Sequence, residues 1–477
     1  MRALRRIAAV AVAGAALYYA GIVNSLVIYK PSRIGAVLVV VAIAAALALL
    51  VAALRGTGRD EAAAPVRATP ATRWALRITW AFISVMALVS LSWMYGAPRQ
   101  RSDDWTPYHN DAIALSECAA RLVLAGQDPY RSLDLFDCYG RGAIGPDRTT
   151  PLRRGVFADV AIYPDDDQLD AAWTSDARTG RNEEFVWRPS YPALSFLLIV
   201  PWVRAGWDTN AFYLGCLLAA MALVLVRAQR SLRPWLLTGL LGATSLAAFT
   251  VGGSSDLLYA FPLTAAWLWR ERRWTALALG IACATKQLAW FFAPFYLLQV
   301  ASRDGWREAA RRAGLAGAVF AAANLPFVLA DPAAWVAGMV TPVAEPMFPR
   351  GAGIVFLSTN GLLPLFPGAA YLALEAIAAA AVLVAAWRAR RSSPELGIVL
   401  AMVPLYFAHR SLFSYFFLLP LFAFAGIARL PVTDLRPASA RAAGALTLLA
   451  RPAEGVPVRE RVQGQGPLRS EATANGA

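Results

Sequence analysis

The sequence predicts an all-α polytopic membrane protein with about 12 transmembrane helices and a large first extracytoplasmic loop. Apolar residues make up 58% of the 477 positions, charged residues only 16%, and the mean hydropathy is +0.48. Soluble domains carry about 25% charged residues, so this composition excludes one water-soluble globule, and its apolar content excludes a disordered chain. The apolar residues also form long blocks, several of about 18 residues or more without a charge, which is the length that crosses a bilayer.

Residues 1–73 predict two transmembrane helices and a cytoplasmic loop. The first apolar block, 7–28, follows three arginines and is too long for the apolar region of a signal peptide, so we expect a retained span. A second block covers 34–54 and a third covers 74–95. The loop between these two blocks is basic and contains Arg55, Arg59, Arg67 and Arg73. Since Lys and Arg stay in cytoplasmic loops, the N-terminus is expected inside and the segment after the third span outside.

The segment 98–190 is acidic, in contrast to the rest of the chain. It contains 11 arginines and 16 acidic residues, whereas the whole chain has a net charge of +14. Membrane topology produces this asymmetry, so the basic remainder does not indicate nucleic-acid binding. Two of the four cysteines, Cys118 and Cys138, lie in this loop. An oxidising exterior would permit a disulfide between them, although their spacing alone does not show that they pair.

Residues 74–430 are expected to form the membrane core, which includes the acidic loop. The later apolar blocks alternate with arginine clusters and cover 236–251, 257–269, 275–285, 288–300, 313–329, 361–387, 396–407 and 412–427. The region 191–226 contains two apolar pieces, although charge parity requires an odd number of crossings there, so we interpret it as one bent or partly re-entrant crossing. The segment 431–477 lacks periodicity and is expected to be a disordered cytoplasmic tail.

Lys286 is one of only two lysines, against 43 arginines, and it lies between apolar halves. The basic ends of 275–300 are expected on the same side of the membrane, which places Lys286 near an outer apex. Its side chain could simply extend to the membrane–water interface, where water solvates the ammonium group. Alternatively, it could be a point charge for a phosphate that arrives from the bilayer.

Asp111 begins an expected amphipathic helix, 109–125, that Gly126 ends. Asn110 or Asp111 could serve only as the helix cap, which the residues alone favour. The alternative is a general base that takes a proton from a sugar hydroxyl. Asp103 and Asp104 compete with Asp111 for this role, because they directly follow the third span.

Further candidate residues are cationic and are expected on the same outer face. His409 and Arg410 are adjacent at an outer helix end, where phosphate contact is about as plausible as a structural role. Arg188 and Arg350 could join this cluster, although a solvated charge is favoured for each. No metal is expected at His109 and Asp111, because two ligands are too few. The acidic run 165–167 could bind a hard cation, but a hydrated turn is favoured.

Several of these residues lie in segments that resemble glycosyltransferase family 87. The segments are Asp111, Ala119-Ala120-Arg121-Leu122-Val123-Leu124-Ala125-Gly126-Gln127-Asp128-Pro129-Tyr130, Tyr191-Pro192-Ala193-Leu194, Ala278-Leu279-Gly280-Ile281-Ala282-Cys283-Ala284-Thr285-Lys286-Gln287, and Pro404 through His409. The resemblance runs from roughly 74 to 430 and implies a C-type glycosyltransferase fold. It also implies a polyprenyl-phosphate sugar donor, in particular mannose, with Asp111 as the catalytic aspartate and His409 and Lys286 at the donor phosphate. Gly252-Gly253-Ser254-Ser255-Asp256 stands where the family often has a Gly-Gln and Asn motif.

The sequence therefore predicts an inverting glycosyltransferase of the plasma membrane, with cytoplasmic termini and an extracytoplasmic active site. Its expected partners are a lipid-linked donor, a glycan or glycolipid acceptor and membrane lipids, with no nucleic acid and no cofactor. If His409, Arg410, Arg350 and Lys286 supply the positive charge, no metal is required. The alternative is a transporter or flippase for a lipid-linked or acidic solute, in which Lys286 and His409 would be substrate or proton sites.

Overall fold

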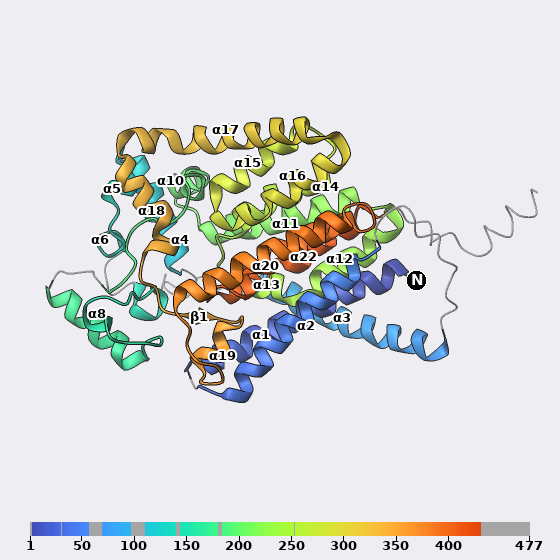
Figure 1. The fold of residues 1–477 in the computed structure, drawn as a ribbon, viewed down its shortest axis with the longest axis horizontal. Coiled ribbons are helices and arrows are strands. Elements are labelled where there is room, and N and C mark those ends of the chain that lie inside the picture. The colour runs from blue at the N-terminus through green and yellow to red at the C-terminus, as the bar shows by residue number, and fades with distance from the viewer. Residues whose placement is uncertain are drawn as a thin grey trace, which may run out of the picture. The chain divides into compact units, whose positions relative to one another are not determined.

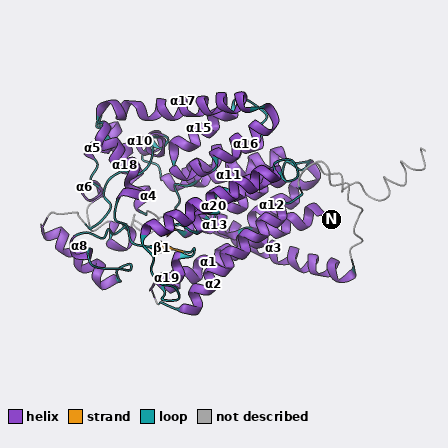
Figure 2. Cartoon of the chain, viewed as in Figure 1, coloured by secondary structure: helices purple, strands orange, loops and turns teal. Residues whose placement is uncertain are grey.

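Helices dominate the part of the chain that the computed structural model describes (Figures 1 and 2). The described residues are 2–29, 31–56, 69–96, 110–139, 144–179, 184–251 and 253–430, and they lie within one unit, 1–432. The candidates Asp103, Asp104 and His109, and the expected tail 431–477, lie outside the described residues. The architecture confirms the all-α membrane class.

The N-terminal helices match the three expected spans closely. They are α1 (Arg2–Tyr29), α2 (Arg33–Leu54) and α3 (Pro70–Gly96). Ser32 caps α2, because its side chain accepts a hydrogen bond from the backbone N–H of Gly35. Figure 1 shows α1 and α2 side by side, and α1 and α3 also pack against α12 and α13. The N-terminal segment is therefore part of the bundle.

The acidic segment folds into short helices and turns. They are α4 (Asp111–Leu124), α5 (Pro129–Ser132), α6 (Leu135–Tyr139), η3 (Pro146–Arg148), η4 (Gly155–Phe157) and α8 (Asp166–Thr179). Helix α4 ends where the sequence predicts, since Gly126 has a φ of +72°, a conformation that favours glycine. A disulfide joins Cys118 of α4 to Cys138 of α6. Glu117 also accepts hydrogen bonds from Tyr139 and Thr209, so α4 is fixed on two sides.

The remaining chain forms helices of very unequal length. They are α9 (Leu194–Leu197), α10 (Val200–Arg204), α11 (Thr209–Arg227), η5 (Arg230–Leu232), α12 (Arg233–Gly242), α13 (Thr244–Val251), α14 (Leu257–Leu268), α15 (Thr275–Thr285), η6 (Gln287–Phe291), α16 (Ala293–Asp304), α17 (Trp306–Ala330), α18 (Pro332–Ala344), α19 (Val355–Thr359), α20 (Gly368–Ala389), η7 (Pro394–Leu396), α21 (Gly397–Leu400), η8 (Pro404–Tyr406), η9 (Phe413–Tyr415) and α22 (Leu419–Ile427). In Figure 1, α17 (gold) runs beside α15 along one side of the bundle.

The number of clear spans is smaller than the sequence suggests. Six described helices are long and apolar enough to cross a membrane, and a seventh results if α12 and α13, bent by 52°, count as one span. In the region 191–226, only α11 meets this criterion. Four further expected spans, 257–269, 275–285, 396–407 and 412–427, occur as apolar helices of 10–17 residues, and 288–300 is divided between η6 and α16. The expected count of about twelve is therefore not confirmed. Polar or proline residues interrupt several of them, such as Lys286 between α15 and η6.

Two short strands form the only sheet among the described residues. Strand β1 (Arg350–Gly351) pairs in parallel with β2 (Arg410–Ser411), and the register places Arg350 opposite Arg410. Gly351 has a φ of +146°, and a Cβ atom there would lie 2.1 Å from the backbone oxygen of Ser411. Only glycine fits at this position, so this residue is what allows the two arginines to be neighbours.

A buried ion-pair network joins the residues that follow the C-terminal ends of α14 and α22. Glu395 accepts hydrogen bonds from Arg270 at 2.7 and 3.0 Å, from Arg429 at 3.2 Å and from the indole of Trp267 at 2.8 Å. These contacts connect the end of α14 with η7 and with the residue that follows α22. Because every charge in this group has an opposite partner, the network can tolerate its burial.

Candidate active site

Two adjoining cavities contain most of the candidate residues. The large cavity has a volume of about 1490 Å³ and is lined by α1, α4, α13, α20 and the segments around Lys286 and His409. The small cavity has a volume of about 450 Å³ and lies between α1, α4, the turn at 148–150 and both strands. Asp111 and Arg410 line both cavities. They are the two charged residues among the nine that the described linings of both cavities share, so both lie where the cavities meet.

Asp111 is not the cap of α4. The side chain of Asn110 accepts the N–H of Ile113 at 3.1 Å, so Asn110 is the N-cap. The carboxylate of Asp111 accepts the N–H of Ala112 at 2.8 Å and the hydroxyl of Thr150 at 2.5 Å. These bonds orient a carboxylate at the first turn of the helix, with its edge toward the cavities. The capping interpretation therefore applies to Asn110 and leaves Asp111 available for chemistry.

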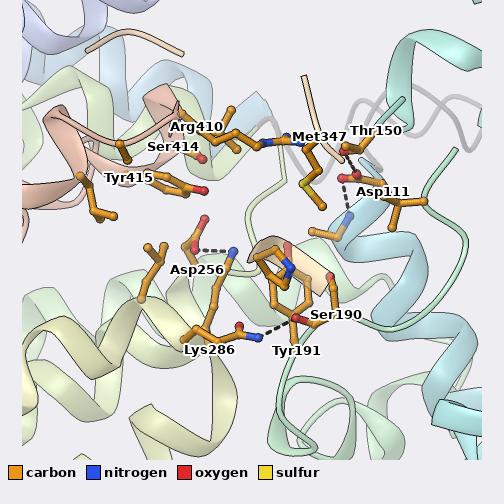
Figure 3. A pocket seen from close by; sticks show the side chains of 18 of the residues that line it. Asp111, Thr150, Ser190, Tyr191, Asp256, Lys286, Met347, Arg410, Ser414 and Tyr415 are labelled. Carbon is orange, nitrogen blue, oxygen red and sulfur yellow. Dashed lines mark hydrogen bonds and ion pairs between the residues drawn. The ribbon is translucent and has the colours of Figure 1, made fainter. Parts of the chain in front are cut away.

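Lys286 has a carboxylate partner that the sequence analysis did not predict. Its ammonium nitrogen lies 2.6 Å from an oxygen of Asp256 and 4.8 Å from the ring centroid of Tyr191. Both members of the pair are buried, with residue exposures of 9% and 4%. Figure 3 shows Asp111 and Thr150 on one side of the cavity and the Lys286–Asp256 pair on the other, with Arg410 between them. Lys286 is thus half of a neutral pair, not an isolated charge.

His409 lies beside Arg410 on the wall of the large cavity. Burial, Arg410 and Arg153 all lower the pKa of the His409 imidazole below its usual 6.5. The side chain is therefore neutral at pH 7 and offers a hydrogen bond instead of a full charge. Its ring lies 5.6 Å from that of Tyr371 on α20. Among the described residues, no ion pair joins the guanidinium of Arg410 to a carboxylate, so this group is the main cation shared by both cavities.

The two remaining arginine candidates lie apart from each other. Arg350 lines the small cavity, and its guanidinium lies 3.9 Å from the ring centroid of Tyr163. Arg188 stacks on Trp187 at 4.1 Å and is absent from the described lining of either cavity. The structure thus brings Asp111, Lys286, His409, Arg410 and Arg350 around two adjoining cavities and leaves Arg188 outside.

The structure also adds residues that sequence reasoning missed. They are Asp256, Tyr415, Arg153 and Thr150 in the large cavity and Arg148 in the small one. Asp256 carries a usable signal, since it is a carboxylate at the start of an apolar helix, where charges are rare. The others lie in loops or beside aromatic residues, and no spacing in the sequence relates them to Asp111.

The acidic run at 165–167 has a local explanation. Asp165 accepts the N–H of Gln168 at 2.9 Å, and the Gln168 side chain accepts the N–H of Asp165 at 3.1 Å. This reciprocal pair is a capping box at the start of α8, and Asp166 and Asp167 complement the helix dipole. Within the described residues, no group of three or more His, Cys, Asp or Glu side chains has an arrangement that could hold a metal ion.

Comparison with known proteins identifies one family. The model of glycosyltransferase family 87 matches residues 190–414, which include Lys286, Arg350, His409 and Arg410 but not Asp111. No curated protein and no solved structure matches the chain. The resemblance inferred from the sequence is thereby confirmed over these residues, and together with the apolar helices it indicates a membrane glycosyltransferase.

Proposed function

We propose that this chain, which matches glycosyltransferase family 87 over residues 190–414, transfers a sugar from a polyprenyl-phosphate donor to an extracytoplasmic lipid or glycan acceptor. The sugar is mannose, as the family resemblance implies, and the configuration at its anomeric carbon inverts. The observation that carries the proposal is the position of Asp111, a carboxylate oriented by Thr150 and by its own helix where two cavities meet.

The large cavity suits a lipid-linked donor. Its walls include Ile22 of α1, Phe249 of α13 and Leu372 of α20, all of them apolar side chains on helices in the bundle. Arg410 and His409 lie on the same cavity wall, where they can contact a phosphate. A polyprenyl chain could therefore remain among apolar side chains while its phosphate sugar approaches Asp111. We also propose that both termini are cytoplasmic and that the site faces the exterior of the plasma membrane.

The reaction needs a single displacement. A carboxylate oxygen of Asp111 takes the proton of the acceptor hydroxyl, and the oxygen of that hydroxyl forms a bond to the anomeric carbon. The bond between this carbon and the phosphate oxygen breaks, and the lipid phosphate leaves with the electron pair. Arg410, a hydrogen bond from His409 and the Lys286–Asp256 pair stabilise the departing phosphate. Attack from the face opposite the phosphate explains the inversion, and no metal or cofactor is needed for these steps.

The decisive experiment replaces Asp111 by Asn, which keeps the shape of the side chain and removes the base. We expect the turnover number to fall about 10²- to 10⁴-fold, with little change in the KM for donor, because only proton transfer is lost. Transfer of radiolabelled mannose from its polyprenyl phosphate, measured in liposomes, reports both quantities. The control is Asp137→Asn, an exposed carboxylate on α6 that should keep full activity.

Two results would contradict the proposal. Full turnover in the Asp111→Asn variant would exclude this carboxylate as the base. Movement of intact donor across the liposome membrane by wild type and variant alike, without sugar transfer, would instead identify a transporter.

A further inference from the structure

The small cavity contains two arginines, Arg148 and Arg350, that do not belong to the described lining of the large cavity. Three arginines from three separate segments line it, namely Arg148, Arg350 and Arg410. Polar side chains form much of the remaining wall, and they are Asn24, Ser25, Asn110, Thr149, Thr150 and Ser414. Asp111 is the one carboxylate that lines it within the described chain. Among the described residues, the lining is thus cationic except at the proposed base.

An unsatisfied polar group supports a ligand at this place. Asn24 of α1 is only 7% exposed, and its side-chain oxygen has no hydrogen-bond partner among the described residues. A buried amide oxygen without a partner is costly, so such groups usually receive a donor from a ligand or water. The hydroxyl of a sugar is a donor of the right kind. The cavity therefore offers both an acceptor for a hydroxyl and cations for an anion.

Two of these arginines, Arg350 and Arg410, are positioned by the protein itself. The register of β1 and β2 sets Arg350 opposite Arg410, and the close approach at Gly351 requires a glycine. The Arg350 guanidinium also lies over the ring of Tyr163, at 3.9 Å from the ring centroid. Rigid guanidinium groups are well suited to phosphate and carboxylate groups, which they bind with two parallel hydrogen bonds.

From this geometry we infer that the acceptor is an anionic glycan or glycolipid, whose phosphate or carboxylate group binds Arg350 and Arg148 in the small cavity. The inference rests on the proposed function, because it assigns the large cavity to the donor. The acceptor hydroxyl then reaches Asp111 from the side opposite the lipid phosphate, as a single inverting displacement requires. Arg350 is consequently a specificity residue of the acceptor site and not a contact of the donor phosphate.

The test uses the full-length protein in phosphatidylcholine liposomes with radiolabelled polyprenyl-phosphate mannose. The acceptor is a glycolipid and glycan extract from a strain that lacks the gene, separated by anion exchange into neutral and anionic fractions. We expect label only in the anionic fraction. Equal labelling of the neutral fraction overturns the inference but leaves the proposed function intact. Donor that stays uncleaved with both fractions contradicts the proposed function itself.

Arginine variants then identify the residues that bind the anionic group of the acceptor. Arg350→Gln and Arg148→Gln should each raise the KM for the anionic fraction about tenfold, with kcat and the KM for donor nearly unchanged, because a charged hydrogen bond is lost. Arg350→Lys should recover part of this loss, which shows that the protein still folds. The control is Arg178→Gln, an exposed arginine on α8. Salt should raise the wild-type KM for acceptor more than that of Arg350→Gln, and an equal salt effect would overturn the inference.

A chemical treatment separates the two sources of negative charge. Hydrofluoric acid removes phosphate groups from the anionic fraction, whereas carbodiimide-directed reduction removes carboxylates. Loss of acceptor activity after one treatment identifies the group that the arginines bind. Full activity after both treatments together would overturn the inference.

Discussion

The role inferred for Lys286 changes once its ion-pair partner, Asp256, is known. An isolated lysine between apolar helices suggests a free cation for phosphate, but its ammonium group lies 2.6 Å from a buried carboxylate. The pair has no net charge, so it contributes less to phosphate binding than the sequence suggests. It can still donate a hydrogen bond from the ammonium group into the large cavity, where both residues lie. The contribution of the pair to stability and its contribution to donor binding should therefore be measurable separately.

We predict that Lys286→Gln and Asp256→Asn each destabilise the protein by about 3–5 kcal/mol, because each leaves an unpaired buried charge. The double variant, which has no charge at either position, should recover most of this stability. If the ammonium group also contacts the donor phosphate, the double variant should fold normally and still have a raised KM for donor. Thermal unfolding in detergent measures the first quantity, and a KM for donor equal to wild type in the double variant would exclude the contact.

At the level of elements, close helix packing depends on small residues. Helix α15 packs against α17 at Gly280, where an added Cβ would lie 2.7 Å from the backbone oxygen of Ala316 and 2.7 Å from Cβ of Val319. Backbone atoms cannot move away as a flexible side chain can, so the two helices would have to separate. Small residues often fill this role in membranes, where helices associate by close packing. Since α15 leads directly into Lys286, this contact also positions the buried pair.

We predict that Gly280→Leu lowers the free energy of unfolding by about 2 kcal/mol or more through overpacking. Because α15 would shift, the KM for donor should rise as well. The matched control is Gly317→Leu on α17, where nothing lies within 4 Å of the added Cβ. Thermal midpoints in detergent compare the two variants. Equal midpoints for Gly280→Leu and wild type would contradict the packing that the structure shows.

At the scale of the whole described chain, the two cavities and the buried arginine network lie at different ends of the helix bundle. The two cavities lie at the end formed by α4, the strands and the acidic segment. Asp256 and Tyr415, which line the large cavity, precede α14 and α22. The arginine network around Glu395 lies beyond the C-terminal ends of these two helices, next to the basic loops. This division agrees with an extracytoplasmic site, because basic loops remain in the cytoplasm.

Labelling with a maleimide that does not cross membranes tests this orientation in intact cells. In a background with Cys216→Ala and Cys283→Ala, we predict that Arg178→Cys on α8 reacts from outside. By contrast, Arg391→Cys in the loop after α20 should react only after the membrane is opened. Cys118 and Cys138 do not interfere, since they form a disulfide. Reaction of Arg391→Cys in intact cells, or protection of Arg178→Cys, would reverse the proposed topology.

Properties that depend on composition and local pattern could be predicted from the order of the amino acids. Apolar blocks identified α1, α2 and α3 to within five residues at each end, because hydrophobicity and length largely decide which segments enter a membrane. The helix at Asp111 and its end at Gly126 also followed from local signals. The motifs around Lys286 and His409 led to the family that residues 190–414 match.

Which charged side chains contact one another depends on the three-dimensional fold. Asp256 and Lys286 are 30 positions apart, and Arg350 and Arg410 are 60 positions apart, so no helical or strand period relates either pair. Electrostatic interactions act through space at short range, whereas a sequence pattern records only neighbours along the chain.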